Sequence, residues 1–503
     1  MSSSSHSITM STAATDDGAV EAGLRAKSNT PIIQHKDNTG PAAMVCDPEI
    51  EKRVVRKMDW HVMTLICFLY LLAFLDRSNV GNARLAGMAK DLDLNRDGRY
   101  DWLLTIFYIG YIISEPLILM FKILPARIWM ACVVFGWGVA ATAQAGAQSW
   151  GGMMAARFFL AVFEAGFGPG AIYLLSFFYL RRELGLRTGM FICAAPLATC
   201  FAGALAYGIT AGNPGIARWR LLFLVEGAPV LVMAVVTYFA MPNSPKEAWF
   251  LTEEEKQVAL ARTMRQAGKA ERQGALNFKE LAATFFDIKS WVTPLIYFSC
   301  NVSFASLPVF LPTILQDMGF SGLDAQGLSA PPYLLAFIVT IFTCIIADRT
   351  QQRGLTIICT SILGGAGYIM LAVGKSTGVR YAGVFLAAGG VFPSIGNVLP
   401  WVLNNQGNDD RRGAGIVLLN LIGQCGPLLG TRLYPLNEGP DYTKGHSICA
   451  AFMFFTTLMA LLLRTLLARE NKKLDARYGR LTEEDQLESE GLENFGPKFR
   501  YVL

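Results

Sequence analysis

YLLAFLDRSNVGNARLAG, residues Tyr70–Gly87, places an acid beside a base at the end of an apolar segment. The apolar run from Trp60 to Leu75 is directly followed by Asp76 and Arg77. A helix needs about 20 residues to cross the hydrocarbon core of a membrane. Two interpretations are therefore open. The helix either stops at Asp76, with the pair in an external loop, or continues and takes both charges into the membrane.

The residues after the pair suit the second interpretation, because they are small or carry amides. Such residues favour a wet cavity or a close neighbouring helix over lipid. They are Ser78, Asn79, Gly81, Asn82, Ala83, Ala86 and Gly87. A charge at that depth costs about 3 kcal/mol on insertion scales and marks substrate or proton pathways. In a loop, the same pair would be unremarkable.

The composition indicates a membrane protein with many helical spans. The 503 residues are 52% hydrophobic and 17% charged, whereas soluble domains carry about 25% charged residues. The net charge of +5 is small and spread over loops, so it indicates no nucleic-acid partner. Ten cysteines form no CxxC pair and lie mostly in apolar runs, which favours buried packing over metal or disulfide chemistry. We expect no metal and no cofactor.

The hydrophobic pattern predicts an all-α protein with twelve spans. The first six are 60–88, 101–122, 126–146, 152–180, 187–211 and 219–241, and the second six are 291–316, 330–347, 355–374, 379–403, 412–433 and 447–467. The charged stretch between them opens with two prolines and contains a capping-box pattern at Thr252–Glu255. The predicted domains are an N-terminal tail 1–58, a six-helix bundle 59–241, a linker 242–290, a second six-helix bundle 291–467 and a C-terminal tail 468–503.

Positive charges predict the orientation. They gather at one set of loops, as Lys52, Arg53, Arg56, Lys57, Arg181, Arg182, Arg187, Arg349, Arg353, Arg411, Arg412, Arg469, Lys472 and Lys473. The opposite loops 147–151 and 317–329 carry no Lys or Arg, and the loop region around Lys90–Arg99 is mixed in sign and does not overturn this asymmetry. The positive-inside rule therefore places both tails and the linker in the cytosol. Six spans on each side of a charged linker is the arrangement of a two-bundle transporter.

The predicted fourth span carries a second pair of charges. Arg157 and Glu164 are seven residues apart, so they lie on one helix face about 10 Å apart along the axis. With Asp76 and Arg77 they can form a cluster of four charges with no net charge. The alternative is that these charges only hold helices together. We favour transport, because ionisable residues inside membranes are usually functional.

Several other polar side chains inside spans are candidates for hydrogen bonds to a substrate, although bonding between helices is the commoner role. They are Tyr108, Tyr111, Asn301, Asn404, Asn405, Asn420 and Gln424. Glu115, before Pro116, is expected near the cytosolic end of the second span in a structural role. Arg220 and Glu226 are expected to form a packing or gating pair.

Six segments carry a family resemblance. They are FLDRSNVGNARLAGMAKDL, WLLTIFYIGYIISEP, RFFLAVFEAGFGPGAIYLLSFFYLRRELGLR, WRLLFLVEG, WVLNNQGNDDRRGAGIVLLN and ENFGPKFRYVL. Together they resemble the major facilitator superfamily, its anion:cation symporter branch and, within that branch, the fungal allantoate permease group. The similarity runs from about residue 48 to the C-terminus. It implies import of a carboxylate nutrient or vitamin with protons, without naming the substrate.

The resemblance also implies residue roles. Asp76 and Glu164 would exchange protons, Arg77 would bind the substrate carboxylate, and Arg157 would tune the acids beside the substrate. The charges agree with this division. With both acids ionised the cluster is neutral, and protonating the acids leaves a site for an anion. Proton and anion binding then reinforce each other.

Two departures from the superfamily pattern affect the expected gate and direction. FKILPARIW, after the second span, lacks the superfamily's Gly-x-x-x-Asp-Arg-x-Gly-Arg-Arg motif, whereas ADRTQQRG after the eighth keeps Asp348, Arg349 and Arg353. We therefore expect Asp348 and Arg349 to act in gating. The fifth span lacks the Gly-Pro-x-x-Gly-Gly signature of drug/proton antiporters, although Gly426-Pro427-Leu428-Leu429-Gly430 resembles a fragment of it.

The sequence thus predicts a monomeric transporter in the plasma membrane, which imports a small organic carboxylate with protons by alternating access. No enzymatic constellation is present outside apolar helices. An exporter or antiporter of a secondary metabolite is the first alternative, and a nutrient sensor that binds without transport is the second.

Overall fold

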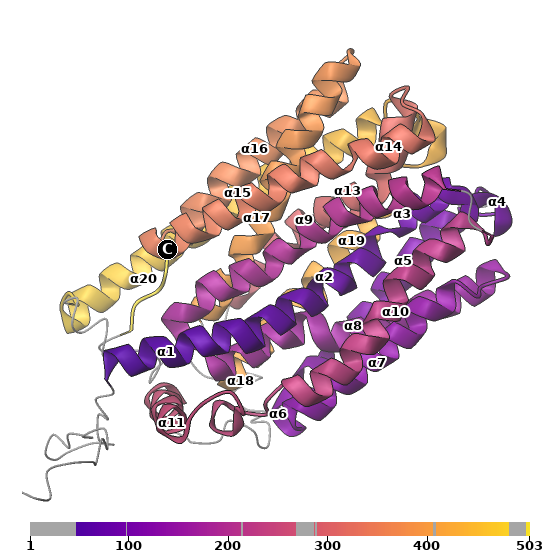
Figure 1. Ribbon diagram of the computed structural model, residues 1–503. Coiled ribbons are helices and arrows are strands. Elements are labelled where there is room, and N and C mark those ends of the chain that lie inside the picture. Colours follow the sequence, from indigo (N-terminus) through magenta and orange to yellow (C-terminus); the bar gives the residue numbers. More distant parts are fainter. Residues whose placement is uncertain are drawn as a thin grey trace, which may run out of the picture. The chain divides into compact units, whose positions relative to one another are not determined.

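The computed structural model describes residues 47–96, 98–212, 215–267, 286, 289–405, 409–481 and 499–503, and Pro48–Leu503 forms one compact unit. All regular structure in these residues is helical, and twelve helices are long and apolar enough to cross a membrane (Figure 1). The twelve predicted spans are therefore confirmed. Residues 1–46 of the predicted N-terminal tail lie outside the described residues, as do most of 268–288 and all of 482–498.

The first half of the chain holds six of the spans. Its elements are α1 (Pro48–Met58), η1 (Asp59–Met63), α2 (Thr64–Ser78), α3 (Val80–Ala83), η2 (Arg84–Met88), α4 (Ala89–Asp91), α5 (Arg99–Ser114), η3 (Glu115–Leu119), α6 (Met120–Ile123), α7 (Ala126–Gln144), α8 (Trp150–Phe178), α9 (Arg181–Ala211) and α10 (Arg218–Ala240). The elements α1 to α4 run on as one span, and α5 to α6 as another.

The second half holds the other six spans, after a connecting stretch with η4 (Pro245–Glu247) and α11 (Glu253–Ala267). Its elements are α13 (Lys289–Asp317), α14 (Gly322–Leu328), α15 (Ala330–Thr350), α16 (Arg353–Val373), α17 (Thr377–Asn404), α18 (Asp409–Gly423), α19 (Cys425–Gly430), η5 (Leu436–Glu438) and α20 (Thr443–Tyr478). The predicted capping box of α11 is present, since Thr252 and Glu255 exchange side chain to backbone hydrogen bonds of 2.9 and 3.3 Å.

The first span answers the question that the sequence leaves open. The helix α2 continues through Asp76 and Arg77 to Ser78, breaks briefly at Asn79 and resumes as α3. Asp76 is buried at 1% exposure. The pair therefore lies within a span and not in an external loop.

The two ends of the helices are named here by the elements found at them. The α11 end carries α1, α11 and the C-terminus, and the α14 end carries α4 and α14 (Figure 1). Toward the α14 end the two halves touch. Gln326 Nε2 donates to the carbonyl of Asn82 at 3.4 Å, and a Cβ on Gly81 would overlap the backbone of Val309. Glycine at 81 thus permits the two helices to close on each other.

Small residues also bring α16 and α17 into backbone contact. A Cβ on Gly390 would overlap the backbone of Gly364, and one on Gly367 would overlap the backbone near Ala387. Helices in a membrane pack through such close approach, because lipid offers no hydrophobic drive between them. These two helices therefore pack with their backbones in direct contact.

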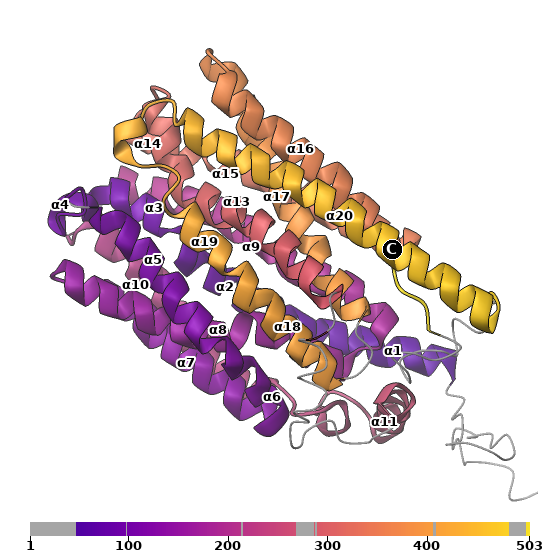
Figure 2. The same ribbon diagram turned by 180° about the vertical axis from the view of Figure 1, so that it is seen from behind.

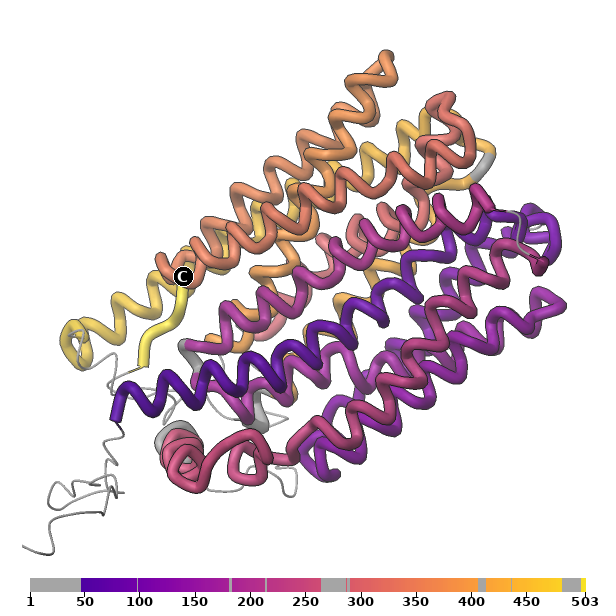
Figure 3. Tube along the Cα trace, viewed as in Figure 1, coloured from indigo at the N-terminus to yellow at the C-terminus, as the bar shows by residue number. Residues whose placement is uncertain are grey.

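The last described residues, 499–503, form a C-terminal strap across the α11 end of the second half (Figure 3). Val502 and Asn405 exchange hydrogen bonds of 2.9 and 3.1 Å, and Trp401 Nε1 donates to the Val502 carbonyl at 2.8 Å. Tyr501 and Asn471 exchange two further bonds of 2.8 Å. The strap thereby ties α17 to α20.

We expect Asn405→Ala to loosen the strap without affecting substrate binding. The change removes both bonds to Val502, which costs about 1–3 kcal/mol where a buried partner is left unpaired. Labelling of a Val502→Cys protein by a thiol reagent should become faster, while the apparent KM for uptake stays the same. A raised KM with unchanged labelling would return Asn405 to the substrate candidates.

Candidate functional site

A small cavity lies between the two halves of the chain. Its lining comes from α2, α5, α8 and α9 on one side and from α13, α17 and α18 on the other, with Tyr70, Arg77, Tyr111, Gly168, Pro169, Ile172, Phe191, Ile192, Tyr297, Asn301, Phe304, Leu399, Asn420 and Gln424. The cavity measures about 20 Å³, which is room for about one water molecule. A substrate of several heavy atoms enters only after the helices move apart.

Arg77 is the charged residue of the cavity wall. Its Nη2 donates to Glu164 Oε2 at 2.8 Å, and its guanidinium lies over the rings of Phe107 and Tyr111, with centroids at 4.9 and 5.0 Å. The Arg77 side chain is 13% exposed and that of Glu164 is 1% exposed. Glu164 thus holds Arg77 from behind, while the arginine faces the cavity.

Asp76 points away from the cavity. Its Oδ2 accepts a hydrogen bond of 2.7 Å from Nε1 of Trp137 on α7, and Asp76 does not line the cavity. Successive residues on a helix are about 100° apart, so the neighbours Asp76 and Arg77 address different sides of α2. The two predicted proton-coupling acids therefore have different surroundings.

Arg157 forms no ion pair within the described part of the chain. Its Nη1 contacts the backbone carbonyl of Asp76 at 3.5 Å, and its guanidinium lies 5.1 Å from the centroid of Phe107. The cluster expected from the sequence thus contains one ion pair, Arg77–Glu164. Phe107 contacts both arginines through cation–π interactions, a role that its position in an apolar run did not reveal.

The other residues predicted to bind substrate fall into two groups, those that line the cavity and those that do not. Asn420 lines the cavity, as do Tyr111, Asn301 and Gln424. Tyr108 and Asn404 are buried but are not part of the lining. Sequence reasoning missed the aromatic residues Tyr70, Phe191, Tyr297 and Phe304, because they look like ordinary residues of apolar spans.

The two walls of the cavity differ in chemistry. The first half supplies the cation Arg77 and, behind it, the acid Glu164. The second half supplies Tyr297, Asn301, Asn420 and Gln424 with two apolar residues. The charge of the lining therefore comes from the first half and its amides come from the second half.

At the α11 end, the two residues expected to act in gating, Asp348 and Arg349, have different surroundings. Asp348 Oδ1 accepts from Arg353 Nη2 at 2.9 Å, and Arg353 is fully buried, whereas Arg349 is exposed. A Cβ on Gly185 of α9 would overlap this ion pair. The pair Asp348–Arg353 thus packs directly against the first half, and Arg349 is outside the contact.

Arg220 and Glu226 do not pair with each other. Arg220 Nη1 donates to the carbonyl of Ala145 at 2.7 Å, and Glu226 accepts from Asn79. Asn79 in turn accepts from Asn82 at 2.9 Å. The predicted Arg220–Glu226 pair is wrong, because the two side chains of α10 reach different neighbouring helices.

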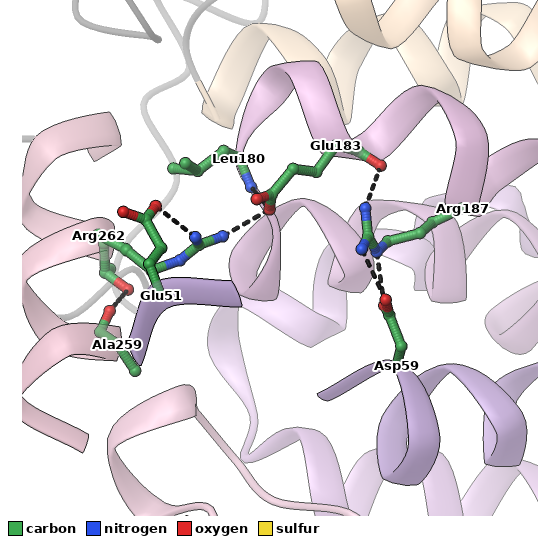
Figure 4. A network of polar contacts seen from close by, with 8 residues as sticks. Glu51, Asp59, Leu180, Glu183, Arg187, Ala259 and Arg262 are labelled. Carbon is green, nitrogen blue, oxygen red and sulfur yellow. Dashed lines mark hydrogen bonds and ion pairs between the residues drawn. The ribbon is translucent and has the colours of Figure 1, made fainter. Parts of the chain in front are cut away.

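A network of ion pairs joins the linker helix α11 to α1 and α9 (Figure 4). Arg262 binds Glu51 and Glu183 at 2.5 Å each, and Arg187 binds both carboxylate oxygens of Asp59 at 2.6 and 2.7 Å. Arg262 is 3% exposed. The network fixes the connecting stretch to the first half at the α11 end.

A second contact between α11 and α1 joins Glu255 to Lys57 at 2.7 Å. Burial alone would raise the pKa of the Glu255 carboxyl, but the hydrogen bonds from Lys57 and Thr252 outweigh burial and lower its pKa. Glu255 therefore stays ionised and keeps α11 attached to α1 at neutral pH.

Comparison with known proteins agrees with the fold. The Major Facilitator Superfamily profile matches residues 66–431. MFS transporter prlL of a fungus (Fungal sp., strain NRRL 50135) is 34% identical over 438 residues, which cover 84% of this chain and 88% of that protein. The high-affinity nicotinic acid transporter of Saccharomyces cerevisiae is 29% identical over 458 residues, 90% of this chain and 85% of that protein. The solved proton:xylose symporter XylE has a TM-score of 0.62 at 14% identity and covers 79% of this chain and 94% of its own.

Proposed function

This chain belongs to the Major Facilitator Superfamily and is a secondary transporter, and from that premise we propose that it imports a small organic carboxylate together with protons. The observation that carries the proposal is Arg77, which faces the cavity while the buried carboxylate of Glu164 holds it from behind. A guanidinium binds a carboxylate through two parallel hydrogen bonds. The substrate would take the position opposite Arg77.

The proposed coupling between proton binding and substrate binding follows from the charge balance at Arg77. Arg77 is held by one anionic partner, and loss of that partner would leave an uncompensated charge in the protein interior, which is costly. When Glu164 binds a proton, its hold on Arg77 is lost and the substrate carboxylate supplies the negative charge instead. Proton and substrate therefore bind together, and each raises the affinity for the other. Asp76, held by Trp137, is proposed as a second proton-binding acid near this site.

The uncharged residues of the lining indicate the shape and polarity of the rest of the substrate. Tyr70, Phe191, Tyr297 and Phe304 offer aromatic faces, and Asn301, Asn420 and Gln424 offer amides. This lining suits a small, partly flat acid with a hydrogen-bonding edge. A relative is named as a nicotinic acid transporter, and nicotinic acid is such a compound. We place the chain in the allantoate permease group of the anion:cation symporters on these grounds together with its motifs.

The proposed movement rocks the bundle 59–241 against the bundle 291–467 around the cavity. We propose that the α11 end, with its basic loops, faces the cytosol and that the α14 end faces outward. The Asp348–Arg353 pair against Gly185 would then close the cytosolic side. The contact of Gln326 with Asn82 would close the outer side. We propose a monomer in the plasma membrane.

Uptake in a yeast strain that depends on this chain for a carboxylate should rise as external pH falls from about 7 to about 5, because protonation of Glu164 releases Arg77 for the substrate. A panel of labelled carboxylic acids identifies the substrate, and a protonophore should abolish its accumulation. Uptake that ignores the protonophore or needs sodium alone would contradict proton coupling. Faster loss of preloaded substrate at low external pH would indicate an exporter instead.

A further inference from the structure

Glu115 is a buried acid that the proposed mechanism does not use. It is 0% exposed, and neither of its carboxylate oxygens has a hydrogen-bond partner within the described part of the chain. The three other acids described above as buried within spans each have a donor. Asp76 has Trp137, Glu164 has Arg77, and Glu226 has Asn79. An acid that served only to hold helices together would have such a donor as well.

The backbone places Glu115 next to the cavity on its α11 side. Glu115 begins η3, the tight turn that follows α5, and lies one helical turn beyond the cavity residue Tyr111. The segment η3 packs against α8 of the first half and α18 of the second, and α8 and α18 lie side by side in Figure 2. Glu115 is therefore located between the cavity and the α11 end, where the halves meet.

The Arg77 guanidinium lies 5.0 Å from the centroid of the Tyr111 ring, and Glu115 lies one helical turn beyond Tyr111 in the same span. The Nε of Arg77 has no partner among the described residues. Arg77 thus has one acid that it binds now, Glu164, and a second acid without a hydrogen-bond partner, Glu115, one helical turn beyond the ring that its guanidinium contacts.

We propose that Glu115 is the proton-releasing acid of the transport cycle and the alternative ion-pair partner of Arg77. The inference rests on the proposed proton-coupled function. In the state described here Arg77 pairs with Glu164, and Glu115 carries its proton, since an unpaired carboxylate would be an uncompensated buried charge. A proton then binds Glu164 from the α14 end as the substrate carboxylate binds Arg77.

Release follows at the other end of the cycle. When the substrate leaves toward the α11 end, the O–H bond of Glu115 breaks, its proton passes to water at that end, and Arg77 pairs with the new carboxylate. Return of Arg77 to Glu164 moves the proton of Glu164 to Glu115, so one O–H bond breaks and one forms. By this route one proton crosses with each anion through Glu164 and Glu115, and Arg77 has one negative partner at every stage.

The test uses Glu115→Gln in the full-length transporter, with rates normalised to surface protein and with the substrate found in the uptake panel. Glutamine mimics the protonated acid and cannot release a proton. Net proton-driven accumulation should fall at least tenfold, while exchange of external for internal substrate, which needs no net proton release, stays within about twofold. The apparent KM should change little. Glu115→Asp, which keeps an ionisable group, should restore net accumulation with a displaced dependence on internal pH.

Each outcome decides the inference. Accumulation by Glu115→Gln at the wild-type rate overturns it, since the acid then releases no proton. Equal loss of exchange and accumulation at normal surface levels also overturns it, because Glu115 would then serve binding or structure. If Glu115→Gln is absent from the surface, Glu115→Asp decides, and an unchanged internal pH dependence counts against the inference. The proposed function fails separately, if wild-type uptake itself ignores protons.

Discussion

Replacing Arg77 with lysine should weaken apparent substrate affinity about 10- to 150-fold while the protein still reaches the membrane. Lysine keeps the positive charge beside Glu164, so the buried acid keeps a counter-ion. It cannot present the planar fork that binds a carboxylate bidentately. Loss of one charge-assisted hydrogen bond costs about 1.5–3 kcal/mol. Initial uptake rate against substrate concentration, normalised to surface protein, measures the effect.

Arg157→Lys is the matched control for this experiment. Arg157 lies on the neighbouring helix α8 and contacts the same Phe107 ring, but it does not line the cavity. Its replacement should therefore change the apparent KM much less than Arg77→Lys. The opposite order, with Arg77→Lys like wild type and Arg157→Lys impaired, would make Arg157 the anion-binding residue.

Replacing Glu164 with glutamine should abolish proton-driven accumulation, by at least tenfold, and leave part of the exchange activity. The amide has the size of the protonated acid but can neither release a proton nor neutralise Arg77. Arg77 then lacks the partner that a proton displaces, so substrate binds without proton uptake at Glu164 and the proton gradient drives no accumulation. Accumulation against a gradient, compared with counterflow exchange in the same vesicles, separates the two activities.

Asp76→Asn tests whether the second acid binds a proton during transport, and Glu226→Gln is the control variant. An asparagine oxygen can still accept the Trp137 hydrogen bond, so folding should be retained while the titratable group is lost. Glu226 is equally buried in the same half and is not part of the cavity lining, so Glu226→Gln should still accumulate substrate. Wild-type accumulation by both Asp76→Asn and Glu164→Gln would make these two acids structural.

The helices could be predicted well because their signal is local. A span needs a long apolar run, and the predicted spans 101–122, 355–374 and 379–403 end within one residue of the helix ends at Ile123, Val373 and Asn404. The main differences are at the two ends of the chain. The first span begins at Pro48 instead of 60, and α20 continues to Tyr478 instead of 467, because helix-forming polar residues flank the apolar runs. Membrane hydropathy reports the apolar part of a helix and not its extension beyond lipid.

Side-chain partners were harder to predict, because they depend on how each helix is rotated against its neighbours. The spacing of Arg157 and Glu164 placed both on one face of a helix, but Glu164 pairs with Arg77 and Arg157 pairs with no acid among the described residues. Trp137 as the donor to Asp76 lies on a different helix, and no local pattern points to it. Glu115 looked structural for the same reason, since the sequence does not show that it lacks a donor.

The difference between the two cavity walls has a consequence for how such transporters diversify. The groups proposed to draw on the proton gradient come from the first half, and Asn301, Asn420 and Gln424 come from the second. Mutations can therefore alter the amide residues of the second half without altering the proton-coupling residues of the first half. After a gene duplication, we expect the two copies to acquire new substrates through substitutions in the second half. Both copies should remain coupled to the proton gradient for much longer.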